Sequence, residues 1–280
     1  MNKEPFISVV IPTFNRVKFI EPVIKILIEE KKQYPRMEII IIDGGSGDGT
    51  AEILKKYSDG LAYWVSERDK GAADAFTKGV LAARGDYVRH FADDDQWIPG
   101  TMRIMADYLA QHSEIDILGA KAESFAMDKE GNLKPFPIPV TSGDFIFKDY
   151  LEPERKGVII TETCFFKRTL FSEIGYWNLR YGIACDVDFM IRALKRKKKV
   201  RCIDILIVKK IWHVESCIWK APESFRKNYC RSILKHAGFF PAIRYAWKYM
   251  LPDYLNGPKL RDNYLIKFVR RVHGRLIRAK

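Results

Sequence analysis

Three consecutive carboxylates, Asp93, Asp94 and Asp95, follow the apolar, aromatic-containing run 86–91. Like charges this close repel one another, so a chain rarely holds them together without a counter-charge. In extended geometry Asp93 and Asp95 point to one side and Asp94 to the other. Two carboxylates on one side suit Mg²⁺ or Mn²⁺, which bind through one or two carboxylates plus substrate phosphates. The triplet therefore indicates either a divalent-cation site or a solvated turn before a helix.

Two further polar clusters follow predicted strands, at residues 12–16 and 43–50. Asp43 ends its strand, where it can accept a hydrogen bond from a base N–H or a ribose hydroxyl. The glycines around it do not fit the dinucleotide motif G-x-G-x-x-G, because Thr50 stands where the third glycine is required, and the lysine of a P-loop is missing. The alternative for this segment is a tight strand-to-helix turn with Asp48 as the N-cap.

The elements that must position these clusters alternate between strands and helices. Continuous apolar strands alternating with amphipathic helices indicate a parallel sheet covered on both faces. In such sheets ligands bind beyond the carboxyl ends of the strands, where all three clusters fall. We expect strands at 6–11, 37–42, 61–65 and 87–91 and helices at 17–32, 51–57, 72–83 and 99–112, with Pro99 in the first turn of the last helix.

The pattern is less regular after residue 122. We expect strands at 115–122, 158–166 and 203–208, a loop at 128–142 and a helix at 187–197. From Pro222 onward the pattern predicts two or three basic helices, broken near Pro241 and Pro252. The chain is therefore expected to contain a domain at residues 1–215 and a basic helical extension at 216–280.

The amino-acid composition is typical of a globular protein. The 280 residues are 47% apolar and 13% aromatic, enough for a substantial core. No apolar run is long enough for a transmembrane helix, and the first residues do not have the pattern of a secretory signal. Five cysteines with no C-x-x-C pair favour reduced thiols, so we expect a cytoplasmic protein.

Charge is distributed unevenly along the chain. Residues 195–280 contain 23 Lys and Arg against 5 Asp and Glu, whereas the first 194 residues contain 25 against 30. A basic tail suggests a polyanionic partner. Apolar residues four apart in this tail would form one stripe along a helix: Leu260, Tyr264, Phe268, Val272 and Leu276. Such a helix could lie on the anionic cytoplasmic face of a membrane, or it could pack on the domain.

Together the clusters resemble the family 2 glycosyltransferases, which have the nucleotide-sugar-binding GT-A fold. The matching segments have the family's order and spacing over about the first 110 residues, and a weaker match continues to about residue 215. They are 8–16, 42–50, 66–71, 85–87, 93–95 and 99–100, and then 163–168, 175–177 and 186–188. The resemblance implies a Rossmann-like, mostly parallel α/β sheet flanked by helices, with the basic helical extension after it.

The resemblance also implies residue roles in binding the donor. Pro12 and Thr13 would line the base pocket, and Asp43 would accept a hydrogen bond from N3 of uracil or thymine. Asn15 and Lys70 lie in matching segments and are expected to bind the donor as well. Asp93 or Asp94 would contact ribose or metal, with Asp93 as the candidate second ligand. Asp95 would bind the Mn²⁺ or Mg²⁺ that bridges the diphosphate.

The resemblance also implies a catalytic base. In the family this is the Asp of a Glu-Asp pair, which corresponds to Asp186. Here Cys185 replaces the Glu, a departure from the family's pattern. Removal of the acceptor proton by Asp186, with the metal as Lewis acid, predicts a single displacement that inverts the anomeric carbon. His213 could contact the diphosphate or the metal, or be a packing residue. Packing is also expected for Trp97, Trp177 and Trp219.

The sequence thus predicts an inverting, metal-dependent transferase of the hexosyl type. It would move a sugar from a UDP- or dTDP-sugar to a saccharide or lipid-linked acceptor in cell-surface polysaccharide or glycolipid assembly. The alternatives are a sugar nucleotidyltransferase, which would require a phosphate-binding loop after the first strand, and a polyanion-binding protein that uses the basic tail. Nucleic acid is not an expected partner, because no motif for it is evident.

Overall fold

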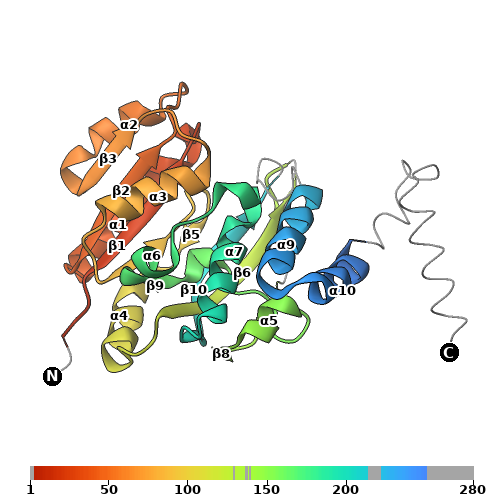
Figure 1. Ribbon diagram of the computed structural model, residues 1–280. Helices are drawn as coiled ribbons and strands as arrows, with labels where there is room; N and C mark the ends of the chain where they lie inside the picture. The colour runs from red at the N-terminus through yellow and green to blue at the C-terminus, as the bar shows by residue number, and fades with distance from the viewer. Residues whose placement is uncertain (1–2, 129, 136–137, 139, 214–221, 251–280) are drawn as a thin grey trace, which may run out of the picture.

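The computed structural model describes residues 3–128, 130–135, 138, 140–213 and 222–250 (Figure 1). Its ten strands form one sheet in the order β3-β2-β1-β4-β9-β6-β10-β5, with β7 beside β6 and β8 beside β10. The strands are β1 (Ile7–Thr13), β2 (Met37–Asp43), β3 (Tyr63–Ser66), β4 (Tyr87–His90), β5 (Gln96–Trp97), β6 (Ile117–Met127), β7 (Leu133–Pro135), β8 (Gly143–Phe145), β9 (Phe165–Lys167) and β10 (Val200–Trp212).

The helices cover both faces of this sheet, as the sequence predicts. One hydrophobic cluster joins the sheet to α1, α2 and α4, and a second joins it to α3, α5, α6, α7, α9 and α10. The helices are α1 (Val17–Gln33), α2 (Thr50–Lys56), α3 (Ala72–Ala82), α4 (Thr101–Gln111), α5 (Phe147–Leu151), α6 (Thr169–Ile174), α7 (Cys185–Lys195), α9 (Pro222–Ala237) and α10 (Phe239–Tyr249).

Half of the sheet is parallel and half is mixed. β3, β2, β1 and β4 pair in parallel, and β1 and β2 are almost wholly buried, as expected for strands covered on both faces. β9 then pairs antiparallel with both β4 and β6, and β10 lies parallel to β6. The short β9 thus joins the parallel half to the half that contains β10.

Several of the predicted boundaries are wrong. The helix expected at 99–112 begins at Thr101, because Gly100 has a φ of +79° and Glu30 of α1 accepts hydrogen bonds from the N–H groups of Gly100 and Met102, both at 2.8 Å. Pro99 therefore precedes the helix. The strand expected at 158–166 is reduced to β9, because residues 161–163 form the 3₁₀ turn η2 (Thr161–Thr163) instead.

The loop predicted at 128–142 contains β7, and the strand predicted at 203–208 is part of the much longer β10. The expected break near Pro241 lies at Gly238, which has a φ of +91°, while Pro241 sits in the first turn of α10, where its missing N–H is not needed. Pro252 lies outside the described residues. No helix in the described part of the chain is long and apolar enough to cross a membrane.

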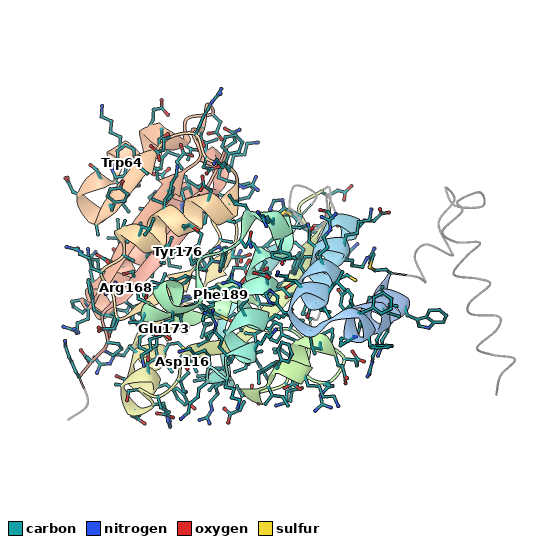
Figure 2. All side chains as sticks on the ribbon, viewed as in Figure 1. Trp64, Asp116, Arg168, Glu173, Tyr176 and Phe189 are labelled. Carbon is teal, nitrogen blue, oxygen red and sulfur yellow. The ribbon has the colours of Figure 1, made fainter. Side chains whose placement is uncertain are left out.

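The last two described helices share the core of the sheet domain. Tyr229 and Ile233 of α9 are buried in the same cluster as Phe189 of α7, and Phe189 packs on Phe171 with 5.0 Å between ring centroids. Figure 2 labels Phe189 on α7. Asp188 of α7 accepts a hydrogen bond from Ser232 of α9 at 3.0 Å. The boundary at 215/216 remains a prediction.

Candidate active site

The acidic triplet lies just beyond the carboxyl end of β4, in a turn. The extended geometry that would place Asp93 and Asp95 on one side is therefore wrong. Because the backbone turns here, the carboxylates meet different partners: Asp93 and Asp94 face Arg16, which follows β1, and Asp95 faces β10.

Arg16 provides a counter-charge for the first two carboxylates, and His213 provides a hydrogen bond. The Arg16 guanidinium lies 3.5 Å from Asp93 Oδ1 and 3.9 Å from Asp94 Oδ2. His213 Nε2 forms a hydrogen bond with Asp94 Oδ2 at 2.8 Å, and its ring stacks on Phe19 with 5.6 Å between centroids. Burial alone would raise the pKa of Asp94, but the bond to His213 and the nearby cations hold it below its ordinary value. His213 is thus both a packing residue and a neighbour of the triplet.

Lys210 supplies the counter-charge for Asp95. Its Nζ lies 3.0 Å from Asp95 Oδ2 and 2.5 Å from Glu162 Oε1. Burial raises the pKa of Asp95 to about 8, and Glu162 and Asp94 add to this effect while Lys210 opposes it. Burial and the charge of Asp94 raise the pKa of Asp93 to about 7. Burial is the largest cause of both raised pKa values, because it disfavours the charged form of a carboxyl group.

These residues fit a divalent cation by charge. Four carboxyl groups outnumber the two permanent cations in the described part of this site, so a bound divalent cation would offset the negative charge left when all four are ionised; the carboxyl groups belong to Asp93, Asp94, Asp95 and Glu162, and the cations to Arg16 and Lys210. Within the described ranges, no three His, Cys, Asp or Glu side chains form a ready-made metal cage. Mn²⁺ and Mg²⁺ need no such cage, since substrate phosphates complete their coordination.

The expected base pocket lies at the ends of the two neighbouring strands. Thr13 of β1 stands directly opposite Asp43 of β2, and Pro12 is partly exposed beside them. Asp43 is fully buried, and its carboxylate accepts hydrogen bonds from the N–H of Ser46 at 2.9 Å, from the Ser46 hydroxyl and from the Ser66 hydroxyl at 2.5 Å. A carboxylate offers about four acceptor positions, and these three hydrogen bonds use three of them.

The loop after β2 is tied to the loop after β1. The N–H of Asn15, which has a φ of +53°, donates to the Ser46 hydroxyl at 2.7 Å. Asp48 accepts hydrogen bonds from the N–H groups of Thr50 at 3.1 Å and Val17 at 3.0 Å, so it joins the two loops, and Gly49 is the N-cap of α2. Lys70 is exposed, and no described contact brings its side chain to the triplet.

Asp186 lies in the first turn of α7. The Thr161 hydroxyl donates to Asp186 Oδ2 at 3.0 Å, and its oxygen also lies 3.3 Å from Glu162 Oε2. Burial and the charge of Glu162 raise the pKa of the Asp186 carboxyl to about 6, so the group is ionised and basic near neutral pH. Cys185, which replaces the expected Glu, is buried in the core.

Sequence reasoning missed Glu162 and Lys210, which connect the two sides of the site. Glu162 lies in η2, immediately before β9, and Lys210 lies on β10. Each is a charged residue within a largely apolar segment, which was the available signal of a buried, paired charge. Trp97 and Trp177 are core residues, as expected, and Trp219 lies outside the described residues.

A parallel half-sheet ending in an acidic turn, completed by a mixed half that carries a buried carboxylate, is the arrangement of a GT-A glycosyltransferase. The solved structures with this arrangement include Staphylococcus aureus TarS, which is 17% identical with a TM-score of 0.68 over 91% of this chain and 46% of TarS, less than half of that protein. The mannosyltransferase PcManGT of Pyrobaculum calidifontis, in complex with GDP-Man and Mn²⁺, is 19% identical with a TM-score of 0.59 over 86% of this chain and 65% of its own.

The sequence profile of glycosyl transferase family 2 matches residues 8–175, and the chain belongs to this family. An uncharacterized glycosyltransferase of Mycobacterium tuberculosis is 29% identical over 72% of this chain and 75% of its own length. A PGL/p-HBAD biosynthesis glycosyltransferase of Mycobacterium bovis is 26% identical over 67% and 69%. The predicted family, fold and enzyme class are therefore confirmed, in preference to a sugar nucleotidyltransferase or a polyanion-binding protein.

Proposed function

We propose that the enzyme transfers a hexose-type sugar, with inversion, from a UDP- or dTDP-sugar to an acceptor hydroxyl in the assembly of a cell-surface polysaccharide or glycolipid. The observation that carries this proposal is that the Thr13–Asp43 pair and the acidic triplet follow neighbouring parallel strands, while Asp186 of α7 is linked to the triplet through Thr161, Glu162 and Lys210. The donor class is supported by TarS, which has been solved in complex with UDP-GlcNAc. The setting is supported by the relative named for PGL/p-HBAD biosynthesis.

The proposed chemistry assigns one task to each side of the site. Asp43 accepts a hydrogen bond from the base, and the triplet with Arg16 and His213 lies where the diphosphate would bind. Asp95, with Asp93 as second ligand, would hold Mn²⁺ or Mg²⁺, which when bound stabilises the negative charge on the departing nucleoside diphosphate. Asp186 takes the proton of the acceptor hydroxyl as that oxygen attacks the anomeric carbon.

A nucleotide-release assay over a panel of sugar nucleotides, with Mn²⁺, Mg²⁺ or EDTA, tests this function. We expect release with a uridine or thymidine donor and an added metal, and loss of release in EDTA and in Asp95→Ala. A guanosine donor preferred over both would overturn the donor assignment. Full release in EDTA, or in Asp95→Ala, would overturn the metal assignment and leave the glycosyltransferase activity itself in place.

The proposal includes a lipid-linked acceptor and peripheral docking of a cytoplasmic enzyme on the anionic membrane face. The predicted apolar stripe beyond residue 259 lies outside the described residues, but α10 supports docking. This helix is at the rim of the molecule, away from β1–β3 (Figure 1). Its exposed side is aromatic, with Phe240 84% and Phe239 62% exposed, followed by Ile243 and Trp247.

The charge around α10 favours an anionic lipid surface as the partner. Residues 222–249 contain six Lys and Arg against one Glu; the two cations of α10, Arg244 and Lys248, pair with Glu152 and Glu154, and the other four belong to α9. Aromatic side chains beside cations suit the boundary between headgroups and acyl chains of an anionic membrane. Because α9 contacts α7, which carries Asp186, docking through α10 would hold the base near a lipid-linked acceptor.

A further inference from the structure

Lys210 occupies the place next to the predicted metal ligand. Its side chain is 11% exposed, and its Nζ lies between Asp95 Oδ2, at 3.0 Å, and Glu162 Oε1, at 2.5 Å. The N–H of Ile211 donates to the other oxygen of Asp95 at 3.1 Å. Both oxygens of Asp95 are thus engaged by β10, whereas the adjacent Lys209 is exposed on the opposite face of the strand.

A divalent cation at Asp95 and the Lys210 ammonium would compete for the same carboxylate. Mn²⁺ and Mg²⁺ bind carboxylate oxygens at about 2.0–2.2 Å, so a bound ion and an ammonium in hydrogen-bonding contact with Asp95 would repel one another at close range. The ammonium has an alternative position, because Glu162 already holds it at the shorter of its two contacts. Burial alone would raise the pKa of Glu162, but Lys210 keeps it below its ordinary value, so this carboxylate is ionised and ready to bind the lysine alone.

We propose that Lys210 is a cation with two positions: it neutralises Asp95 in the metal-free enzyme and moves to Glu162 alone when a divalent cation binds Asp95. Glu162 is then a positioning residue that determines how readily the metal site opens. This inference rests on the metal assignment of the proposed function. It implies that the free enzyme binds the metal weakly, and that the diphosphate of the donor adds the oxygen ligands needed to displace Lys210 from Asp95.

A titration with Mn²⁺ in the absence of nucleotide tests the competition directly. Electron paramagnetic resonance measures the free Mn²⁺ and so gives its affinity for the protein. We expect Lys210→Met to bind Mn²⁺ at least about tenfold more tightly than the wild type, since a gain of this size corresponds to removal of one competing contact. Lys209→Met removes the same charge one residue away and should change the affinity by less than about twofold. Equal affinity in Lys210→Met and wild type would overturn the proposal.

A second pair of variants tests whether Lys210 has two positions or whether each side chain acts on Mn²⁺ only through its charge. Glu162→Gln should weaken Mn²⁺ binding, because Lys210 loses its alternative position. In the double variant Lys210→Met/Glu162→Gln this weakening should disappear, since there is no lysine left to hold. Additive effects of the two substitutions would overturn the proposal. Absence of Mn²⁺ binding in wild type and Lys210→Met, also with UDP present, would instead refute the metal site of the proposed function and the inference with it.

A structure of the wild-type enzyme with Mn²⁺ and UDP tests the same movement without a substitution. We expect Lys210 Nζ more than about 4 Å from Asp95 Oδ2 while its contact with Glu162 is kept. A lysine still in hydrogen-bonding contact with an Asp95 that binds the metal would overturn the proposal.

Discussion

Replacement of Asp186 by Asn should make the protein more stable and almost inactive. Burial and Glu162 raise the pKa of this carboxyl from 3.8 to about 6, a difference of about two units. One unit corresponds to about 1.4 kcal/mol, so keeping Asp186 ionised costs the fold up to about 3 kcal/mol at neutral pH. The side chain is partly exposed, and solvent reduces this figure to about 1–3 kcal/mol. Loss of the base should lower transfer by about 10²–10⁴-fold.

The dependence on pH has a definite sign. A carboxyl whose pKa is higher in the folded protein than in the unfolded chain destabilises the fold only where it is ionised. The difference between wild type and Asp186→Asn should therefore be complete above the folded pKa, about 6, and vanish below the ordinary value of 3.8. Thermal melting at pH 8 and below pH 4 measures it, at roughly 2–4 °C per kcal/mol for a chain of this size.

Asp188→Asn is the matched control, because it makes the same change in the same helix. Asp188 is fully buried and pairs with Arg192 at 2.7 Å and His236 at 2.9 Å. Its loss should destabilise the protein by about 3 kcal/mol but leave transfer per folded molecule near the wild-type rate. An Asp186→Asn enzyme that transfers within tenfold of wild type, or that melts no higher at pH 8, would refute the reasoning.

Two further predictions concern the surface and the core. Phe240→Asp should abolish flotation with anionic vesicles, because Phe240 is 84% exposed on α10. Leu81→Asp is the control and should leave flotation unchanged, since Leu81 is 66% exposed on α3. Equal flotation of both variants would exclude docking through α10. Gly79→Ala should lower the free energy of unfolding in urea by about 1–3 kcal/mol, because its Cβ would lie 2.3 Å from Val10 Cγ1. Gly47→Ala, with nothing within 4 Å of the new Cβ, is the control, and equal unfolding midpoints would contradict the packing argument.

The parallel half of the fold follows from local sequence patterns. Each strand from β1 to β4 is a short apolar run ended by polar residues, and the helices between them have their own periodicity, so the elements were predicted within a few residues. The position of Asp43 opposite Thr13 also follows, because neighbouring parallel strands end at the same edge. These parts depend on contacts between consecutive elements.

The other half of the site depends on contacts that no local pattern encodes. The pairs Lys210–Glu162 and Lys210–Asp95 join residues 48 and 115 positions apart. A turn at the triplet was one of the two alternatives, but the partners of its carboxylates could not be predicted, because they lie on β10 and after β1. The same limit applies to η2, which places Glu162 beside Lys210.

Strand β10 has a consequence for how the enzyme matures. It supplies Lys210 and the approach to His213, whose partners in the triplet precede them by 115 and 119 residues. Contacts of such separation carry a larger loop-closure entropy cost than local ones, which slows their formation. Until β10 joins β6, Arg16 is the only cation among the described residues that contacts the first two of these three adjacent carboxylates. A partly folded chain that contains only the parallel half of the sheet would therefore lack the positive charge that Lys210 brings to the triplet. Binding of the sugar nucleotide would then indicate that β10 has joined the sheet.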